Sequence, residues 1–379
     1  MPQLPTMSKR TIASFFNKVP GESASKKPRL SPPLVPDAPP TAHPSYPHPI
    51  ASLPTSLLTL FDASPPPAPR IITKPDLSIA HYNHFFPQST ARQLYLFLRR
   101  SLPFYRVTYT IRRDSLDTTV RTPRYTTVFG VDAHSYFSDD DARTLLDSKT
   151  HKAVSGDRYR GCVCPPRPIP ACLEVLKNLV ERETGDTFNF ILVNYYASSA
   201  DSIAYHSDDE TFLGPNPTIA SLSLGTTRDF LMKHKSDKTQ TLKLPLTNGE
   251  LLVMRGATQR KWLHSIPKRT ATTTGTWTSG GRINITFRNG RSPACTQNYY
   301  RYNVGAGPVY RWHDARDEMV LHTEINSDNT NQDVPAAVTV AATSVDAGTA
   351  AAEVTDIPSI SAAPNTTNQP ADGELDVAP

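Results

Sequence analysis

Residues 189–230 read NFILVNYYASSADSIAYHSDDETFLGPNPTIASLSLGTTRDF, and this stretch decides the fold of the chain. Two runs rich in branched and aromatic residues, 188–196 and 219–225, enclose a polar centre, and such runs bounded by turn residues are typical of strands. The Asn248-Gly249 pair further along predicts a tight turn between two more runs of this kind. We therefore expect additional strands at 229–233, 241–246, 250–254, 262–266 and 282–288.

Two helices are predicted before this series of strands. Residues 89–101 and 170–182 each carry apolar side chains at helical spacing, and Ser89 or Thr90 is the expected N-cap of the first helix. Helices that precede a run of antiparallel strands indicate an α+β fold. We predict a double-stranded β-helix, or jelly roll, with the helices packed on one face.

A β-hairpin is expected between the two helices. Residues 106–112 alternate polar and apolar side chains, and residues 124–129 are the expected partner strand. The tip of this hairpin would lie near Arg112 to Leu116 and would carry Arg112 and Arg113. Two cations at an exposed tip make the hairpin a candidate for contact with an anionic substrate.

The two ends of the chain differ in composition from its centre. Residues 1–80 hold 18 of the 36 prolines, and residues 321–379 contain nine acidic residues and no Lys or Arg. Segments of this kind bury too little apolar surface to offset the entropy lost on ordering. We expect a disordered Pro-rich arm at 1–70, one folded domain at 71–318 and a disordered acidic tail at 319–379.

The charge of the chain is compatible with a polyanionic partner. The net charge is +5, and setting aside the nine acids of the tail leaves +14 on residues 1–320. A basic body suits nucleic acid, because binding releases the counterions of the phosphates. A basic, soluble enzyme without such a partner would show the same charge, so both interpretations stay open.

The cysteine pattern and the lack of long apolar runs indicate the cellular compartment in which the protein works. The spacing of Cys162, Cys164 and Cys172 matches none of the usual zinc patterns, so these residues and Cys295 are expected to be scattered free thiols. No secretory signal and no apolar run of about 18 residues is evident, which favours an intracellular, reducing setting without membrane contact. We expect a monomer.

The Pro-rich arm contains two short motifs. Residues 8–18 read SKRTIASFFNK and would present Ile12, Phe15 and Phe16 together on one helical turn. This segment resembles the motif that docks on the replication sliding clamp, except for Lys9, where that motif has Gln; a chance apolar cluster is the alternative. Residues 26–29 read KKPR, which indicates nuclear import or a solvated charge cluster.

The polar centre of the opening stretch contains a candidate metal site. In His206-Ser207-Asp208 the imidazole and the carboxylate stand at i and i+2, so both point the same way at the end of a strand. His264, in the later run WLHSI, would complete a set of two histidines and one carboxylate. This set is typical of Fe(II) sites with open positions for a keto acid and dioxygen, although an H-x-D triplet alone also occurs on protein surfaces.

A donor-rich strand follows the last of these candidates. The run RINITFR places polar side chains on one face and apolar side chains on the other. Two arginines that bracket an Asn and a Thr suit the carboxylates of a keto acid, although a surface strand would show the same alternation. The candidate donors are Arg282, Asn284, Thr286 and Arg288, with Asn194 and Tyr196 on a neighbouring strand.

The ordered set of these motifs resembles the AlkB family of Fe(II)- and 2-oxoglutarate-dependent dioxygenases, and in particular the DNA-repair branch typified by the second and third human homologues. The resemblance covers roughly residues 76–290 and is carried by 189–230, LPLTNGELLVM (244–254), KWLHSIPKR (261–269), RINITFR (282–288) and TPRYTTVFG (122–130). Two departures are the longer segments 131–158 and 274–281.

The resemblance implies roles for individual residues. His206, Asp208 and His264 would bind iron, and Arg288 would pair with the distal carboxylate of 2-oxoglutarate. Tyr159, in DRYRG, would stack on a flipped base whose other face His206 supports. The remaining implied contacts are Arg282, Asn284, Thr286, Asn194 and Tyr196 with 2-oxoglutarate, Asp209 and Glu210 with the base, and the hairpin residues Arg112, Arg113 and Leu116 with the duplex.

The function implied by the resemblance is oxidative removal of alkyl groups from N1-methyladenine and N3-methylcytosine in DNA, with Fe(II), O2 and 2-oxoglutarate. An RNA- or protein-directed oxygenase on the same scaffold is one alternative, and a non-catalytic nucleic-acid- or clamp-binding module is another. The aromatic and basic segment 298–312 is expected to pack against the barrel, with contact to nucleic acid as its alternative.

Overall fold

The computed structural model of the protein describes residues 38–62, 65–113, 116–139, 143–155, 157–269, 281–302, 304–314 and 316–322. The clamp-like segment 8–18, the KKPR motif at 26–29, nearly all of the loop 274–281 and the acidic tail beyond residue 322 lie outside these ranges. Within the described ranges, the helices are too short or too polar to span a bilayer.

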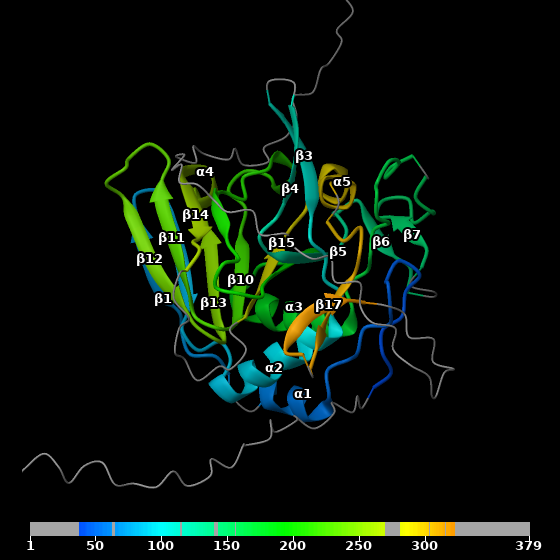
Figure 1. Ribbon diagram of the computed structural model, residues 1–379, viewed down its shortest axis with the longest axis horizontal. Coiled ribbons are helices and arrows are strands. Elements are labelled where there is room, and N and C mark those ends of the chain that lie inside the picture. The colour runs from blue at the N-terminus through cyan, green and yellow to red at the C-terminus, as the bar shows by residue number, and fades with distance from the viewer. Residues whose placement is uncertain are drawn as a thin grey trace, which may run out of the picture. The chain divides into compact units, whose positions relative to one another are not determined.

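Two antiparallel sheets form the centre of the fold, as the strand pattern predicted (Figure 1). The larger sheet contains seven strands in the order β1 (Arg70–Lys74), β2 (Leu77–Tyr82), β13 (Glu250–Arg255), β10 (Ile219–Gly225), β15 (Arg282–Arg288), β8 (Phe190–Tyr196) and β5 (Tyr125–Gly130). The smaller sheet contains β12 (Thr241–Leu246), β11 (Arg228–His234), β14 (Trp262–Ile266) and β9 (Ile203–His206). This arrangement confirms the jelly-roll prediction.

The helices cover one side of the larger sheet. They are α1 (Thr55–Asp62), α2 (Gln88–Ser101) and α3 (Ala171–Thr184), which lie together below the sheet in Figure 1. Leu94 and Leu98 of α2, Leu176 of α3 and Leu222 and Ile285 of the sheet are all buried in one apolar core. Burial of this common core, at about 25 cal/mol per Å² of apolar surface, fixes the helices on that face.

Two details of the helices differ from the sequence prediction. The first turn of α2 begins after Pro87, whose carbonyl accepts the Ala91 N–H, so neither Ser89 nor Thr90 is the N-cap. Residues 38–62 are folded, although we assigned them to a disordered arm that ends at residue 70. Leu57 and Phe61, four residues apart, form a buried apolar stripe on α1. The prolines around this segment led us to predict disorder in place of a helix.

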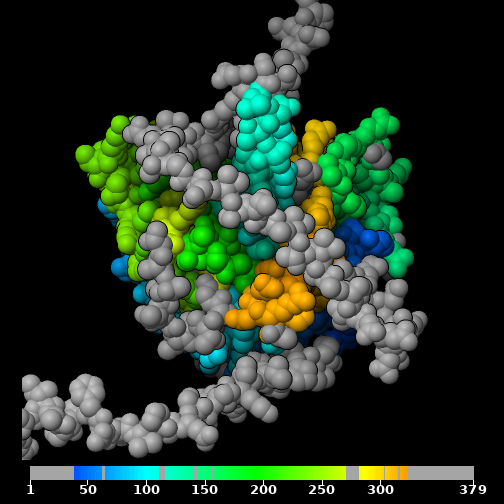
Figure 2. All heavy atoms as spheres, viewed as in Figure 1, coloured from blue at the N-terminus to red at the C-terminus, as the bar shows by residue number. Residues whose placement is uncertain are grey.

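The predicted hairpin exists, but with a different partner strand. β3 (Thr108–Arg113) pairs with β4 (Leu116–Arg121), so that Arg113 lies opposite Leu116 at the tip. The segment assigned as its partner, 124–129, instead forms most of β5 and pairs with β8 in the larger sheet. Every residue of β5 is buried whereas β4 is mostly exposed, so burial decided the pairing. Figure 2 shows the hairpin standing clear of the surface around it.

Several shorter elements complete the fold. They are β6 (Ser135–Phe137), β7 (Leu145–Asp147), the 3-10 turn η2 (Thr211–Leu213), α4 (Thr258–Lys261), α5 (Pro293–Arg301), β16 (Tyr310–His313) and β17 (Glu318–Leu321). Tyr299 and Tyr300 are buried in the second apolar core, and Tyr310 makes an edge contact with Tyr125 at 5.1 Å between ring centroids. Segment 298–312 therefore packs against the barrel, as expected.

Candidate metal and co-substrate site

Neighbouring strands bring the three candidate metal ligands together. β9 ends at His206, which lies opposite His264 of β14, and their ring centroids are 4.2 Å apart. Asp208 follows two residues after the end of β9, where its N–H donates to the Gln259 side chain at 2.9 Å. One ligand atom from each of the three residues lies within 4.8 Å of the others, which is a spacing that one ion can bridge.

The donor chemistry of this trio fits Fe(II). The Nδ1 atom of His206 donates to the Ala204 carbonyl at 2.9 Å, which leaves Nε2 unprotonated and able to bind a metal. Burial lowers the pKa of His264 to about 3, so that its imidazole is neutral. Burial alone would raise the pKa of Asp208, but Arg288, His264 and His206 outweigh it and lower that pKa. Two neutral imidazoles and one carboxylate are the donor set of non-haem iron sites.

A pocket beside the trio carries the donors that the sequence indicated. Asn194, Tyr196, Asn284, Thr286 and Arg288 line it together with His206, Asp208 and His264. All seven residues of β15 are buried, so the polar face of RINITFR points into the protein and the surface-strand alternative is wrong. A buried face lined by hydrogen-bond donors suits an anionic ligand more than it suits an apolar core.

The two arginines of β15 have different hydrogen-bond partners near the pocket. Arg288 Nη2 donates to Asp208 Oδ1 at 2.9 Å, so Arg288 is engaged at the metal ligands. Arg282 Nη2 donates to Ser223 Oγ at 2.8 Å, and among the described residues its Nε and Nη1 atoms have no hydrogen-bond partner. Burial lowers the pKa of Arg282 to about 10, which is still high enough to keep the charge.

The sequence analysis assigned the distal carboxylate to Arg288, and these contacts make Arg282 the alternative partner. Among the described residues, the Arg288 guanidinium pairs with a metal ligand and has one buried nitrogen, Nε, without a partner, whereas Arg282 has two, Nε and Nη1. A buried cation without an anionic partner is costly, so an anionic co-substrate at Arg282 would offset that cost. Sequence spacing could not separate the two arginines, because both lie on the same face of β15.

Arg124 is a residue of this site that the sequence analysis did not single out. Arg124 directly precedes β5, and its Nε atom donates to Asn194 Oδ1 of β8 at 3.1 Å. Its charge also contributes to the lowered pKa of His206, after the larger effect of burial. The arginine lies within TPRYTTVFG, and that motif was the available signal.

The residues expected to contact the base lie in different surroundings. Asp209 Oδ2 accepts a hydrogen bond from Lys235 Nζ at 2.6 Å on the surface. Glu210 is partly buried, and burial is the main cause that raises its pKa to about 7. Tyr159 is absent from the pocket lining, and its hydroxyl bonds to Asp132 instead.

At the hairpin tip, Leu116 is 70% exposed. The backbone of β3 places Arg112 and Arg113 beside it. The structure does not describe the side chains of these two arginines.

Comparison with known proteins gives a consistent result. The profile of the 2OG-Fe(II) oxygenase superfamily matches residues 78–288. The chain is 36% identical to human DNA oxidative demethylase ALKBH2 over 170 residues, which cover 40% of this chain and 63% of that protein. It is 45% identical to human alpha-ketoglutarate-dependent dioxygenase alkB homolog 3 over 124 residues, which cover 31% of this chain and 41% of that protein.

Two further matches extend the comparison. The Arabidopsis thaliana DNA oxidative demethylase ALKBH2 is 40% identical over 142 residues, which cover 32% of this chain and 43% of that protein. The chain thus spans about half the length of the relatives it matches. Among solved structures it is similar to OsALKBH1, at 18% identity and a TM-score of 0.37, over 58% of this chain and 100% of that one.

Proposed function

Because the chain belongs to the 2OG-Fe(II) oxygenase superfamily, we propose that it is an AlkB-type DNA demethylase that repairs N1-methyladenine and N3-methylcytosine. The enzyme uses Fe(II), 2-oxoglutarate and O2. The observation that carries the proposal is the trio of the half-buried His206 and the buried Asp208 and His264, beside the buried hydrogen-bond donors on β15. The relatives named as DNA oxidative demethylases support the choice of substrate class.

Each residue of the site has a defined task in this reaction. His206, Asp208 and His264 hold the metal, and Arg288 keeps the Asp208 carboxylate ionised and oriented. Arg282 receives the distal carboxylate of 2-oxoglutarate, and its bond to Ser223 holds the guanidinium in place. The co-substrate pocket is completed by Asn194, Tyr196, Asn284 and Thr286.

The division of labour between protein and cofactor follows from the burial of the site. When bound, the iron and 2-oxoglutarate would activate dioxygen, which would convert an N-methyl group into a hydroxymethyl group that leaves as formaldehyde, with succinate and CO2 as the other products. The protein contributes orientation and a site with little water around it, because His264 and Asp208 are 6% and 4% exposed. Asp209 and Glu210 follow the metal ligand directly and face the base in this proposal.

The hairpin of β3 and β4 is the proposed contact with duplex DNA. Arg112 and Arg113 would contact phosphates, and Leu116 would enter the stack where the damaged base leaves it. Extruding a base costs a few kcal/mol, and less for a methylated base that cannot pair. We also propose action in the nucleus, with 26–29 as import signal and 8–18 as a contact with the sliding clamp.

The proposal is tested by incubating the protein with Fe(II), 2-oxoglutarate and oligonucleotides that carry N1-methyladenine, as single-stranded DNA, double-stranded DNA and RNA. Mass spectrometry follows the loss of methyl groups, and His206→Ala is the control. Demethylation of DNA that vanishes in His206→Ala is the expected result. A preference for RNA would redirect the proposal to RNA, and 2-oxoglutarate turnover without demethylation of any oligonucleotide would contradict it.

A further inference from the structure

Helix α5 lies between the metal centre and the segment that carries Tyr159. The helix spans Pro293–Arg301 and follows residue 288, where the match to the superfamily profile ends. We call the described part of residues 131–160 the lobe; it contains β6, β7 and Tyr159. In Figure 1, α5 stands between the β3–β4 hairpin and the lobe.

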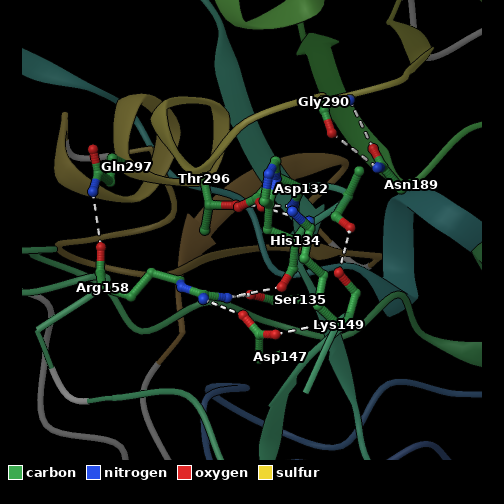
Figure 3. Close-up of polar contacts among 12 residues, drawn as sticks. Asp132, His134, Ser135, Asp147, Lys149, Arg158, Asn189, Gly290, Thr296 and Gln297 are labelled. Carbon is green, nitrogen blue, oxygen red and sulfur yellow. Dashed lines mark hydrogen bonds and ion pairs between the residues drawn. The ribbon is translucent and has the colours of Figure 1, made fainter. Parts of the chain in front are cut away.

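One side of α5 bonds to the lobe through buried polar groups. Thr296 Oγ1 donates to Asp132 Oδ2 at 2.6 Å and accepts the Asp132 N–H at 3.0 Å. The same carboxylate oxygen accepts the Tyr159 hydroxyl. Figure 3 shows Thr296 pointing at Asp132, and beside it Gln297, whose Nε2 donates to the Arg158 carbonyl at 2.8 Å. The Thr296 and Asp132 side chains are almost fully buried, so these bonds are shielded from water.

The lobe is itself cross-linked around this attachment. Arg158 Nη1 donates to the His134 carbonyl at 2.8 Å and to Ser135 Oγ at 3.0 Å, and its Nη2 pairs with Asp147 (Figure 3). Ser135 Oγ also lies 3.0 Å from the Tyr159 hydroxyl. A movement of Thr296 would therefore reach Tyr159 through one shared carboxylate, rather than through a flexible loop.

Tyr299, one turn after Thr296 on the same side of α5, contacts residues beside the metal centre. The Tyr299 ring packs on Phe190 of β8 at 4.6 Å and on Phe212 of η2 at 6.2 Å. The Arg288 guanidinium lies 5.4 Å from the Tyr299 ring centroid, and Arg288 holds the metal ligand Asp208. Two residues one turn apart on one short helix therefore contact Asp132, which accepts the Tyr159 hydroxyl, and Arg288, which pairs with the metal ligand Asp208.

We propose that α5 is a brace that keeps the lobe in register with the metal centre, with Thr296 and Tyr299 as positioning residues. The brace rests on the proposed function, because its task is to hold the lobe that carries Tyr159 in place beside the substrate base while the reaction occurs at the metal. Loss of the α5 contacts leaves the metal and 2-oxoglutarate bound, but the methyl group of the base is no longer held in position at the metal. With an added reductant to consume the second oxygen atom of dioxygen, 2-oxoglutarate is then converted to succinate and CO2 without removal of the methyl group.

The experiment compares Thr296→Val, Tyr159→Phe and Tyr299→Leu with the wild-type protein. Thr296→Val keeps the shape of the side chain and removes its hydroxyl, and Tyr159→Phe keeps the ring and removes its bond to Asp132. Tyr302→Ala, an exposed position directly after the same helix, is the control. The readouts are the KM for a methylated oligonucleotide, the KM for 2-oxoglutarate, the succinate formed per methyl group removed, and the melting temperature.

We expect Thr296→Val and Tyr159→Phe each to raise the KM for the oligonucleotide about 5-fold, the equivalent of one lost hydrogen bond, and to raise the succinate formed per methyl group removed. The KM for 2-oxoglutarate should stay unchanged. The double variant should lose less than the product of the two single losses, because both bonds end on Asp132. Tyr299→Leu should uncouple the reaction in the same way from the metal side.

Three other results would overturn the brace. Wild-type values in all three variants would show that α5 has no such role while leaving the demethylase function intact. Equal loss of 2-oxoglutarate turnover and demethylation, together with a lower melting temperature, would show that α5 only supports the fold. Absence of demethylation by the wild-type protein itself would contradict the proposed function and the brace with it.

Discussion

The metal pocket and the β3–β4 hairpin form two contrasting regions of the molecule. The pocket is assembled from β14, β15 and the end of β9, and its residues His264, Asp208 and Arg288 are 4–6% exposed. The hairpin pairs only with itself, and five of the six residues of β4 are exposed. The pocket thus depends on contacts between distant parts of the chain, whereas the hairpin depends on local pairing. Changes in the pocket should affect every substrate and the fold, and changes in the hairpin should affect only some substrates.

The largest effect is expected at Asp208. Asp208→Ala should lower 2-oxoglutarate turnover and demethylation more than about 100-fold, because even residues that only support a metal ligand are worth about 10- to 100-fold. The variant also leaves the Arg288 guanidinium buried without its carboxylate, which should lower the free energy of unfolding by about 3–5 kcal/mol.

Urea denaturation of the metal-free protein measures the stability effect at Asp208. Asp209→Ala is the matched control for stability, because its exposed pair with Lys235 should contribute at most about 1 kcal/mol. Equal destabilisation by the two changes would mean that the buried Asp208–Arg288 pair does not distinguish the pocket from the surface.

The second effect separates the two arginines of β15. Arg282→Gln should raise the KM for 2-oxoglutarate about 10- to 100-fold, since it removes charge-assisted hydrogen bonds of about 1.5–3 kcal/mol. Arg288→Gln should mainly weaken metal affinity, because Arg288 orients Asp208. Titration of metal and of 2-oxoglutarate in the presence of a redox-inert divalent ion measures both. The reverse pattern would restore Arg288 as the partner of the distal carboxylate.

The third effect is confined to the hairpin and to duplex substrates. Leu116→Ala should lower activity on double-stranded DNA about 10-fold, which corresponds to the loss of about 1.5 kcal/mol of apolar burial in the base stack. Activity on single-stranded DNA should not change, because no stack has to be opened. The ratio of the two activities is the measurement, and equal losses on both substrates would argue against a wedge at this position.

The smallest effect is expected on the stability of the fold when the hairpin is changed, in contrast to a change in the buried strand β15. Leu116→Ser should change the free energy of unfolding by no more than about 0.5 kcal/mol, as is usual for exposed positions. Ile285→Ala, at a fully buried position of β15, should cost about 2–5 kcal/mol through the cavity it creates. Both values come from chemical denaturation, and a large loss at Leu116 would mean that the hairpin packs on the body.

Much of the fold follows from local patterns in the sequence. The strands 219–225, 241–246, 262–266 and 282–288 have the bounds that alternation and turn residues predicted. The partner of a strand is harder to predict, and 124–129 joined β8 because its apolar residues gain more from burial there. The short apolar stripe of α1 was missed for a related reason, because the stabilisation it provides depends on the core against which it packs.

The sequence by itself determined the ligand trio, because the chemistry of iron narrows the choice of side chains and strand geometry sets the spacing of His206 and Asp208. Tertiary structure decided which arginine meets the metal ligand and how Asp132 links α5 to Tyr159. These outcomes depend on distances between residues far apart in the chain. Local periodicity carries no information about such distances, because they are set only when the sheets close and the core packs.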